Sequence, residues 1–253
     1  MTPTHEPRHH ALAPLADLMR LDGHHNPDAL AYTWGRMFAG VDLQARRALE
    51  IGSGRGLLSA YMALRGAAHV TSMEPELVGS TSGVVAAQRR SLAAMGLDGV
   101  VEVVQADFNT WDAAGATFDV IVSRASLNHL YPADTNASSD PTARAGYLTV
   151  LRRVRELLAP DGVFVATDAC RHSLFALARP FGLRRPWRRR RSGVNWRHHQ
   201  DPHVWRRLCL DAGFSRVRIA YPVSHRLRHV EPLANTAAVN FLTGGGFILH
   251  ARR

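Results

Sequence analysis

The chain has 253 residues, of which 46% are hydrophobic and 21% charged, so it is long enough for one large α/β domain with a sizeable core. Its formal net charge is +10, and the chain contains no lysine, so its basic charge comes from arginine. Two cysteines, Cys170 and Cys209, are too few for a disulfide framework and indicate a reducing compartment. No apolar stretch approaches the ~20 residues of a membrane span, and residues 1–10 lack a signal-peptide apolar region, so we expect a cytoplasmic protein with no membrane partner.

The N-terminal part is expected to be helical. Residues 14–21 can form a short helix, and Asn26, followed by a proline and an acid, suits the start of a second helix that would end at Gly40. Tyr32 and Trp34 lie in this second helix, where their apolar face can pack on the core.

A glycine-rich turn follows the first expected strand. Residues 48–51 are mainly apolar, three glycines (Gly52, Gly54 and Gly56) follow at every second position, and residues 57–64 suit a helix. A strand, a glycine turn and a helix in this order let the backbone approach a ligand and present helix N-terminal N–H groups to it. The dinucleotide fingerprint needs its third glycine three positions after the second, where this chain has a leucine. A plain tight turn is the other alternative.

The spacing of Glu50 and the three glycines resembles motif I of the class I S-adenosylmethionine-dependent methyltransferases. The resemblance covers roughly residues 46–170, with weaker support from 201–222 and 246–251. It implies an α/β fold with a doubly wound, mostly parallel, seven-stranded Rossmann-like sheet. The implied organisation is an N-terminal helical lid over 1–45, a cofactor-binding methyltransferase domain over 46–253, and acceptor-side insertions after strands five and six at 171–203 and 222–245. Tyr32, Trp34 and Arg36 are then candidate lid residues.

Carboxylates follow the next two expected strands. Residues 69–74 read as a strand that ends at Glu74, which Pro75 closes, and a carboxylate there can accept hydrogen bonds from both ribose hydroxyls. Residues 100–105 read as a third strand from their β-branched content. By the resemblance, Asp107 then contacts the adenine amino group, and Phe108 packs on the adenine ring. The alternative for Asp107 is a cap for the turn that follows it.

A fourth strand over 118–123 ends in Ser123 and resembles the family's fourth motif. The carboxyl ends of parallel strands form the edge at which open sheets bind ligands. The resemblance therefore implies S-adenosyl-L-methionine as the cofactor and S-adenosyl-L-homocysteine as the product. The expected cofactor-binding residues are Glu50, Gly52, Ser53, Gly54, Gly56, Glu74, Pro75, Asp107, Phe108 and Ser123.

The remaining elements follow from apolar periodicity and turn residues. We expect helices over 82–95, 142–158 and 202–213, and strands over 162–168, 215–223 and 246–251, with a flexible loop over 132–141 and a long connection over 225–245. The resemblance places the last strand antiparallel beside the fifth.

Histidine is the usual general base at neutral pH, and a base is needed only where the acceptor atom must lose a proton. His129 is the first catalytic candidate because it follows the fourth strand, His172 is the second because it follows the fifth, and His199 is the third. For each of them, a surface or structurally satisfied histidine is the alternative. His198, His199 and His203 have a spacing that suits zinc, but nothing nearby completes a convincing site, so no metal is expected.

Residues 123–126 lack the motifs of the adenine-amino and cytosine methyltransferases, and Ser123 cannot replace the charged ligand of a magnesium-dependent enzyme. With those acceptors argued against, the resemblance implies methyl transfer to oxygen or nitrogen of a small-molecule acceptor. One alternative is an RNA methyltransferase that uses the arginine-rich run 184–191 with Trp187 and Trp196. Another is a protein that binds the cofactor without transferring a methyl group.

Overall fold

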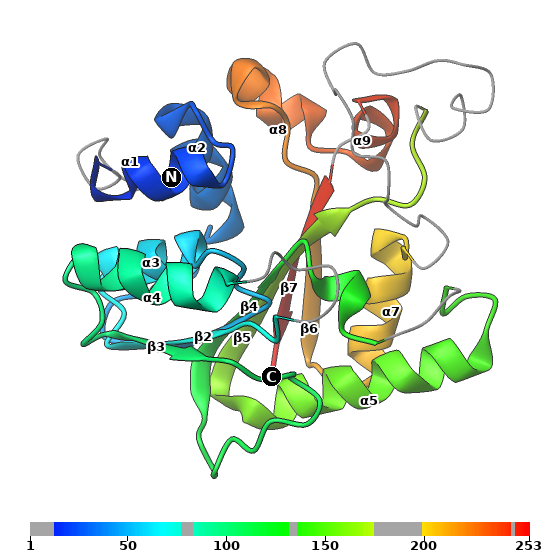
Figure 1. The fold of residues 1–253 in the computed structure, drawn as a ribbon. Coiled ribbons are helices and arrows are strands. Elements are labelled where there is room, and N and C mark those ends of the chain that lie inside the picture. The colour runs from blue at the N-terminus through cyan, green and yellow to red at the C-terminus, as the bar shows by residue number, and fades with distance from the viewer. Residues whose placement is uncertain (1–12, 77–82, 132–135, 175–198, 244–245) are drawn as a thin grey trace. The chain divides into compact units, whose positions relative to one another are not determined.

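The computed structural model describes residues 13–76, 83–131, 136–174, 199–243 and 246–253 (Figure 1). The chain divides into two compact units, which are described separately. The first unit comprises the chain up to residue 124 together with 156–165 and residue 253, and the second comprises 125–155 and 166–252.

The strands form one seven-stranded sheet in the order β3-β2-β1-β4-β5-β7-β6. Strands β1, β2, β3 and β4 pair in parallel, and β6 pairs with β7 in antiparallel fashion. The strand bounds are β1 Arg47–Ile51, β2 His69–Met73, β3 Val101–Val104, β4 Phe118–Arg124, β5 Leu158–Ala169, β6 Arg216–Ala220 and β7 Gly246–Arg252.

In the first unit, the register of the strands aligns their carboxyl ends. Ile51 at the end of β1 lies opposite Met73 of β2 on one side and Ser123 of β4 on the other, and Met73 lies opposite Val104 of β3. The segments that follow these strands therefore leave the sheet at one edge. Helices α3 (Leu57–Leu64) and α4 (Val84–Ala94) pack on these strands (Figure 1).

The N-terminal helices of the first unit are α1 (Ala16–Leu21) and α2 (Pro27–Met37). The Asn26 side chain accepts a hydrogen bond from the N–H of Ala29 at 3.0 Å, which confirms Asn26 as the cap of α2. Trp34 is only 1% exposed, and its ring lies 4.5 Å from that of Tyr61 on α3, centroid to centroid. Trp34 is therefore a packing residue that attaches α2 to α3.

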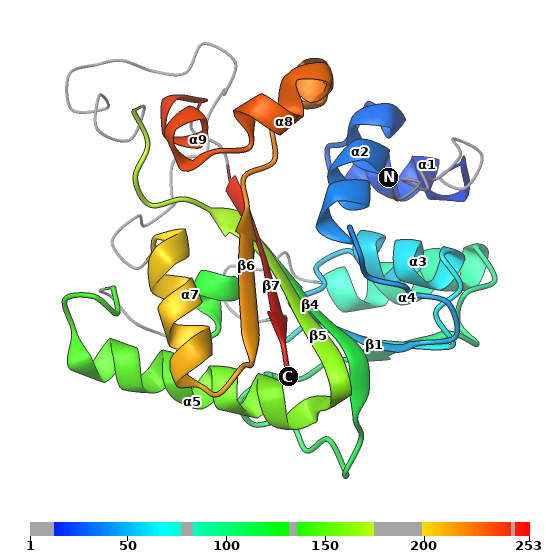
Figure 2. The same ribbon diagram turned by 180° about the vertical axis from the view of Figure 1, so that it is seen from behind.

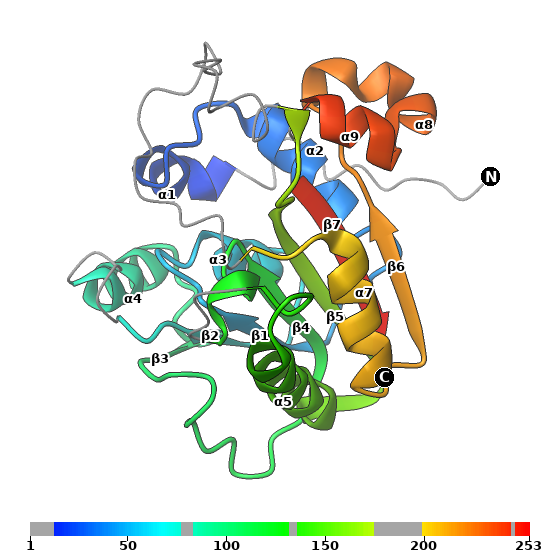
Figure 3. The same ribbon diagram turned by 90° about the vertical axis from the view of Figure 1, so that its right-hand side faces the viewer.

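In the second unit, α7 (Pro202–Asp211) packs on β6 and β7 (Figure 3). Figure 2 shows β6 and β7 side by side, with Ile219 opposite Leu249 in the ladder. Helix α5 (Pro141–Leu157) meets α7 through a perpendicular contact between the rings of Tyr147 and Trp205, whose centroids are 5.0 Å apart. The remaining elements are η2 (Leu127–His129), η4 (His225–Val230), α8 (Glu231–Ala234) and α9 (Ala237–Thr243).

The predicted seven-stranded, mostly parallel α/β fold is confirmed, and β7 lies next to β5 as expected. Residues 225–245 were expected to form a long connection, whereas the structure has the short helices η4, α8 and α9 there. These helices are short and surround an Asn-Thr turn, so their apolar positions give no sustained period from which to predict them. The fifth strand begins at Leu158, four residues earlier than the expected 162, directly after α5.

Candidate functional site

The turn between β1 and α3 depends on its glycines. Gly52, Gly54 and Gly56 have φ angles of 74°, 54° and 76°, in the left-handed region that glycine adopts at little cost. The N–H groups of Gly52 and Ser53 both donate to the carbonyl oxygen of Met73 at 2.9 Å. The turn is thus held against the end of β2.

Gly54 and Gly56 differ in the space that a side chain would have at each position. A Cβ atom built on Gly54 would meet no heavy atom within 4 Å, so the backbone there faces open space. A Cβ atom on Gly56 would lie 2.3 Å from Nε2 of Gln88 on α4, so Gly56 is needed for close packing between the turn and that helix. Gly54 is therefore the position where a ligand can approach the backbone.

Glu74 connects the end of β2 to this turn. Its side chain is buried, one carboxylate oxygen accepts the N–H of Gly54 at 2.7 Å, and the other accepts the N–H of Glu76 at 3.3 Å. Pro75 follows directly. A carboxylate fixed beside a left-handed glycine with open space in front of it provides acceptors for hydroxyl groups of a ligand.

Glu50 belongs to a buried polar network. The Ser59 hydroxyl of α3 donates to the Glu50 carboxylate at 2.5 Å. The hydroxyls of Ser59 and Ser72 are also hydrogen-bonded, 2.7 Å apart, and the Ser72 hydroxyl accepts from the side-chain amide of Gln88. Burial raises the pKa of Glu50 to about 7, against the opposing effects of Ser59 and Arg124. The observed contacts of this carboxyl group are thus with α3.

The remaining predicted cofactor residues lie at the ends of β3 and β4. The carboxylate of Asp107 is half-buried and accepts the N–H of Asn109 at 2.8 Å, so the turn-capping alternative is present in the structure. Phe108 is 3% exposed, and Ser123 is fully buried opposite Ile51. A role of these residues in binding the cofactor stays a prediction.

In the second unit, His129 belongs to a cluster around a buried carboxylate. Its exposed ring meets the edge of the His199 ring, with centroids 6.4 Å apart. Nε2 of the buried His199 lies 4.0 Å from Oδ1 of Asp168 at the end of β5, whose other oxygen accepts the N–H of Asn128 at 3.3 Å. Burial is the main reason that the pKa of Asp168 is raised. Asp168 and Asn128 were not predicted as functional residues, although the strand-end position of Asp168 is the signal that could have found it.

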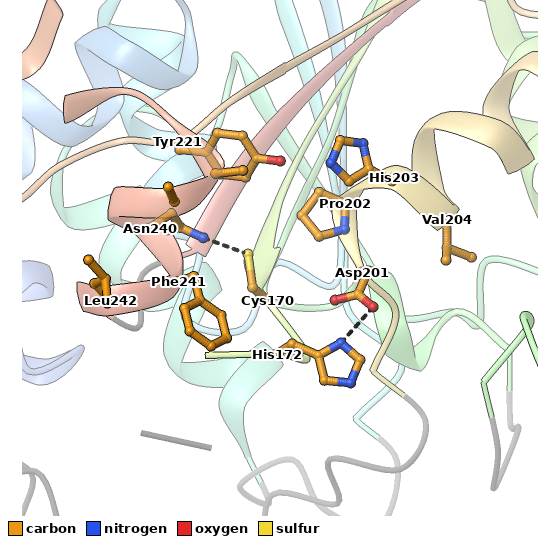
Figure 4. Close-up of a pocket in the computed structure, with 12 residues that line it drawn as sticks. Cys170, His172, Asp201, Pro202, His203, Val204, Tyr221, Asn240, Phe241 and Leu242 are labelled. Atoms are coloured by element: carbon orange, nitrogen blue, oxygen red, sulfur yellow. Dashed lines mark hydrogen bonds and ion pairs between the residues drawn. The ribbon is translucent and has the colours of Figure 1, made fainter. Parts of the chain in front are cut away.

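His172 lies elsewhere in this unit, beside a pocket of about 610 Å³ (Figure 4). Its Nδ1 is 2.8 Å from Oδ2 of Asp201, and both side chains line the pocket. The amide nitrogen of Asn240 on α9 donates to the sulfur of Cys170 at 3.0 Å, and burial raises the pKa of Cys170 to about 11. The other lining residues are Pro202, His203, Val204, Tyr221, Ala237, Ala238, Phe241 and Leu242.

Sequence reasoning found His172 but missed Asp201, Tyr221 and Asn240 as partners at one pocket. Asp201 stands at the N-cap position of α7 but makes no side-chain cap hydrogen bond there, and its carboxylate contacts His172 instead. Asn240 and Tyr221 come from segments that carry no motif. The arginine run 184–191 with Trp187 and Trp196, and also His198, lie outside the described residues.

The described residues contain neither a helix that could span a membrane nor a cluster that could hold a metal ion. No helix in the described ranges combines the length and the apolar character of a membrane span. Within the same ranges, histidine, cysteine and carboxylate side chains do not gather in threes in a way that could hold a metal ion. Of the histidines whose spacing suits zinc, His199 lies beside Asp168, whereas His203 lines the pocket.

Comparison with known proteins shows the family. Residues 23–219 match the model of a family described as a methyltransferase domain. A ubiquinone biosynthesis O-methyltransferase from Parvibaculum lavamentivorans is 34% identical over 151 residues, which cover 56% of this chain and 51% of that protein. A highly reducing polyketide synthase from Alternaria alternata is 35% identical over 97 residues, 37% of this chain and 4% of that protein. The chain thus spans about half or less of the length of these curated relatives.

Solved structures share the fold. An S-adenosylmethionine-dependent methyltransferase from Mesorhizobium loti matches with a TM-score of 0.58 and 16% identity, over 88% of this chain and 98% of that one. A SAM-dependent methyltransferase from Aquifex aeolicus matches with a TM-score of 0.57 and 16% identity, over 94% and 97% of the two chains. At this identity the likeness concerns the fold.

Proposed function

The chain belongs to the family described as a methyltransferase domain, and from this premise we propose that it is a class I S-adenosylmethionine-dependent methyltransferase that methylates an oxygen or nitrogen atom of a small-molecule acceptor. The observation that carries the acceptor class is the pocket of about 610 Å³ beside His172 and Asp201, a size typical of small-molecule sites. The relative named as an O-methyltransferase supports oxygen as the first atom to test.

The first unit supplies groups that fit S-adenosyl-L-methionine. The open space in front of Gly54 admits a ligand close to the backbone, and the fixed carboxylate of Glu74 can accept hydrogen bonds from ribose hydroxyls. Asp107 and Phe108 follow β3, where we propose that they receive the adenine amino group and ring. Glu50, Gly52, Ser53, Gly56, Pro75 and Ser123 complete the proposed site.

When bound, the cofactor supplies a methyl carbon that its positive sulfur has already activated. The protein then has to hold the acceptor atom in line and exclude water, and orientation of this kind lowers barriers by ~7–11 kcal/mol. A hydroxyl acceptor must also lose its proton. We assign this task to the His172–Asp201 pair, because Asp201 orients the imidazole through Nδ1 and both side chains line the pocket. His129 is the second candidate, with His199 and Asp168 behind it.

The N-terminal segment 1–45 is proposed to act as a lid. Helix α2 packs on α3 through Trp34 and Tyr61, and α3 directly follows the glycine turn in the chain. A movement of α2 would therefore also move α3.

The RNA alternative rests on charge alone.

The test is turnover with cofactor labelled on its methyl group. Purified protein is incubated separately with total RNA and with a panel of hydroxylated and amino-bearing small molecules, and the labelled product is identified by mass spectrometry. Label in a small molecule supports the proposal. Label in RNA, lost when Arg188 to Arg191 are replaced by glutamine, would instead favour the RNA methyltransferase.

A further inference from the structure

We propose that residues 225–243 form a surface that docks the protein on a lipid bilayer containing anionic lipids. These residues comprise η4, α8 and α9, lie between β6 and β7 in the chain, and are called the docking segment below. Figures 1 and 3 show α8 and α9 together beyond the end of β6. The inference goes beyond the proposed function, because docking on lipid requires neither a cofactor nor an acceptor.

The docking segment exposes a row of apolar side chains. Leu233 on α8 is 82% exposed, and Leu227 and Val230 on η4 are exposed as well. Because a 3₁₀-helix has three residues per turn, Leu227 and Val230 lie on the same face of η4, and Leu233 follows at the same spacing of three. Single exposed leucines are common on protein surfaces, whereas a row of apolar side chains on one short segment indicates an interaction surface.

Positive charge accompanies this row. Arg226 and Arg228 are exposed on either side of Leu227, and Glu231, the one acid in the sequence of the docking segment, is buried. A guanidinium nitrogen of Arg228 is hydrogen-bonded to Nε2 of His225, which holds the Arg228 side chain beside η4. Exposed leucines interleaved with arginines are typical of elements that lie in a membrane interface, where the apolar side chains enter the acyl boundary and the cations meet anionic headgroups.

The composition of the docking segment favours lipid over a macromolecular partner. Protein–protein interfaces are enriched in aromatic residues and methionine, and surfaces that bind single-stranded RNA stack its bases on aromatic rings. The exposed side chains of the docking segment include no phenylalanine, tyrosine, tryptophan or methionine. No membrane partner was expected from the sequence, because no apolar stretch approaches the length of a span, but a surface that lies on a bilayer needs no span.

Helix α9 connects the docking segment with the pocket beside His172. Leu242 on this helix is 56% exposed and also lines the pocket, as does Phe241 (Figure 4). One wall of the proposed acceptor pocket is thus part of the docking segment, so docking brings the pocket to the surface of the bilayer.

Co-sedimentation of the full chain with vesicles tests the proposal, using phosphatidylcholine either alone or mixed with phosphatidylglycerol. We expect the wild type to bind the mixed vesicles about tenfold more tightly, and this binding should weaken as salt screens the arginines. Leu233→Ser should reduce binding to the mixed vesicles about fivefold, because this side chain no longer enters the bilayer. Leu210→Ser on α7 replaces an exposed leucine outside the docking segment and should bind as the wild type does.

Two further variants test the charge. Arg226→Gln combined with Arg228→Gln should reduce binding to the mixed vesicles by about tenfold. Arg206→Gln combined with Arg207→Gln removes the same charge from exposed positions on α7 and should reduce binding by about twofold at most. Urea unfolding of every variant checks that the fold is retained, which Leu233→Ser should do in any case because this side chain is so exposed.

The proposal is overturned if the wild type binds both kinds of vesicle equally, or if Leu233→Ser binds as the wild type does. Equal losses in the two arginine variants also overturn it, because they indicate nonspecific adhesion of a chain with a net charge of +10. Ultracentrifugation without lipid covers a second copy of the chain: a dimer that Leu233→Ser dissociates, with unchanged vesicle binding, would make this surface an interface between copies. None of these measurements includes cofactor or acceptor, so their failure leaves the proposed function standing.

Discussion

The carboxylate of Glu74 accepts a hydrogen bond from the backbone N–H of Gly54, with the oxygen and nitrogen 2.7 Å apart. The end of the second strand and the glycine turn after the first strand are therefore one connected structure, and each residue fixes the position of the other. This relationship makes the proposed cofactor site testable at two positions with different expected outcomes.

Replacing Glu74 with alanine should weaken S-adenosylhomocysteine binding by ~2–3 kcal/mol, because hydrogen bonds to a charged group are lost and the turn loses its support. Calorimetric titration measures the change. Glu102→Gln, an exposed carboxylate on β3 beside His69, is the control and should bind as the wild type does. Equal affinities for the Glu74→Ala variant and the wild type would remove Glu74 from the site.

Gly54→Ala and Gly56→Ala should separate binding from stability. At Gly54 a Cβ atom meets no protein atom, so the fold should lose only the ~1–2 kcal/mol of a left-handed alanine, while bound cofactor would meet the new methyl group. At Gly56 the Cβ atom clashes with Gln88, which adds ~1–3 kcal/mol of destabilisation. Urea unfolding and calorimetry on both variants check this. Gly54→Val, the bulkier change, should abolish binding.

Glu50→Gln should change how stability depends on pH. Burial raises the pKa of Glu50 from 4.5 to about 7, so between these values the folded protein binds more protons than the unfolded chain does. The free energy of unfolding of the wild type therefore falls as pH rises through this window, by about 3 kcal/mol in total. The glutamine variant lacks this term and should gain stability relative to the wild type up to neutral pH.

Urea unfolding of both proteins from acidic to slightly alkaline pH measures the difference. Parallel curves would show that Glu50 titrates normally. Cofactor titration of the same variant tests the separate prediction that Glu50 supports cofactor binding, in which case affinity falls even though stability rises.

His172→Asn should lower kcat for a hydroxyl acceptor by about a hundredfold, with a smaller effect on KM, because general-base catalysis is typically worth 10²–10⁴-fold. His129→Ala is the matched test of the other candidate, and His69→Gln on β2 is the control. A loss of turnover in His129→Ala with normal turnover in His172→Asn would move the base to the cluster with His199 and Asp168. Steady-state kinetics with the acceptor from the turnover screen decides between them.

Much of this protein could be predicted from local sequence. The glycines at every second position, the acids at the ends of strands and the β-branched runs are local signals, since left-handed glycine, strand propensity and the aligned carboxyl ends of parallel strands do not depend on distant packing. They predicted the sheet, the cap at Asn26 and the place of Glu74 beside the glycine turn. They also gave His172 as a candidate, without its partner.

What only the tertiary structure decided is which side chains meet. The contact of Glu50 with Ser59, the pairing of His172 with Asp201 and the hydrogen bond of Asn240 with Cys170 all join residues that are distant in sequence or carry no motif. Their positions depend on how α3, α7 and α9 pack, and packing depends on the shapes of many side chains at once. The sequence alone therefore determined the family and predicted the cofactor, while the candidate acceptor pocket became visible only once the chain was folded.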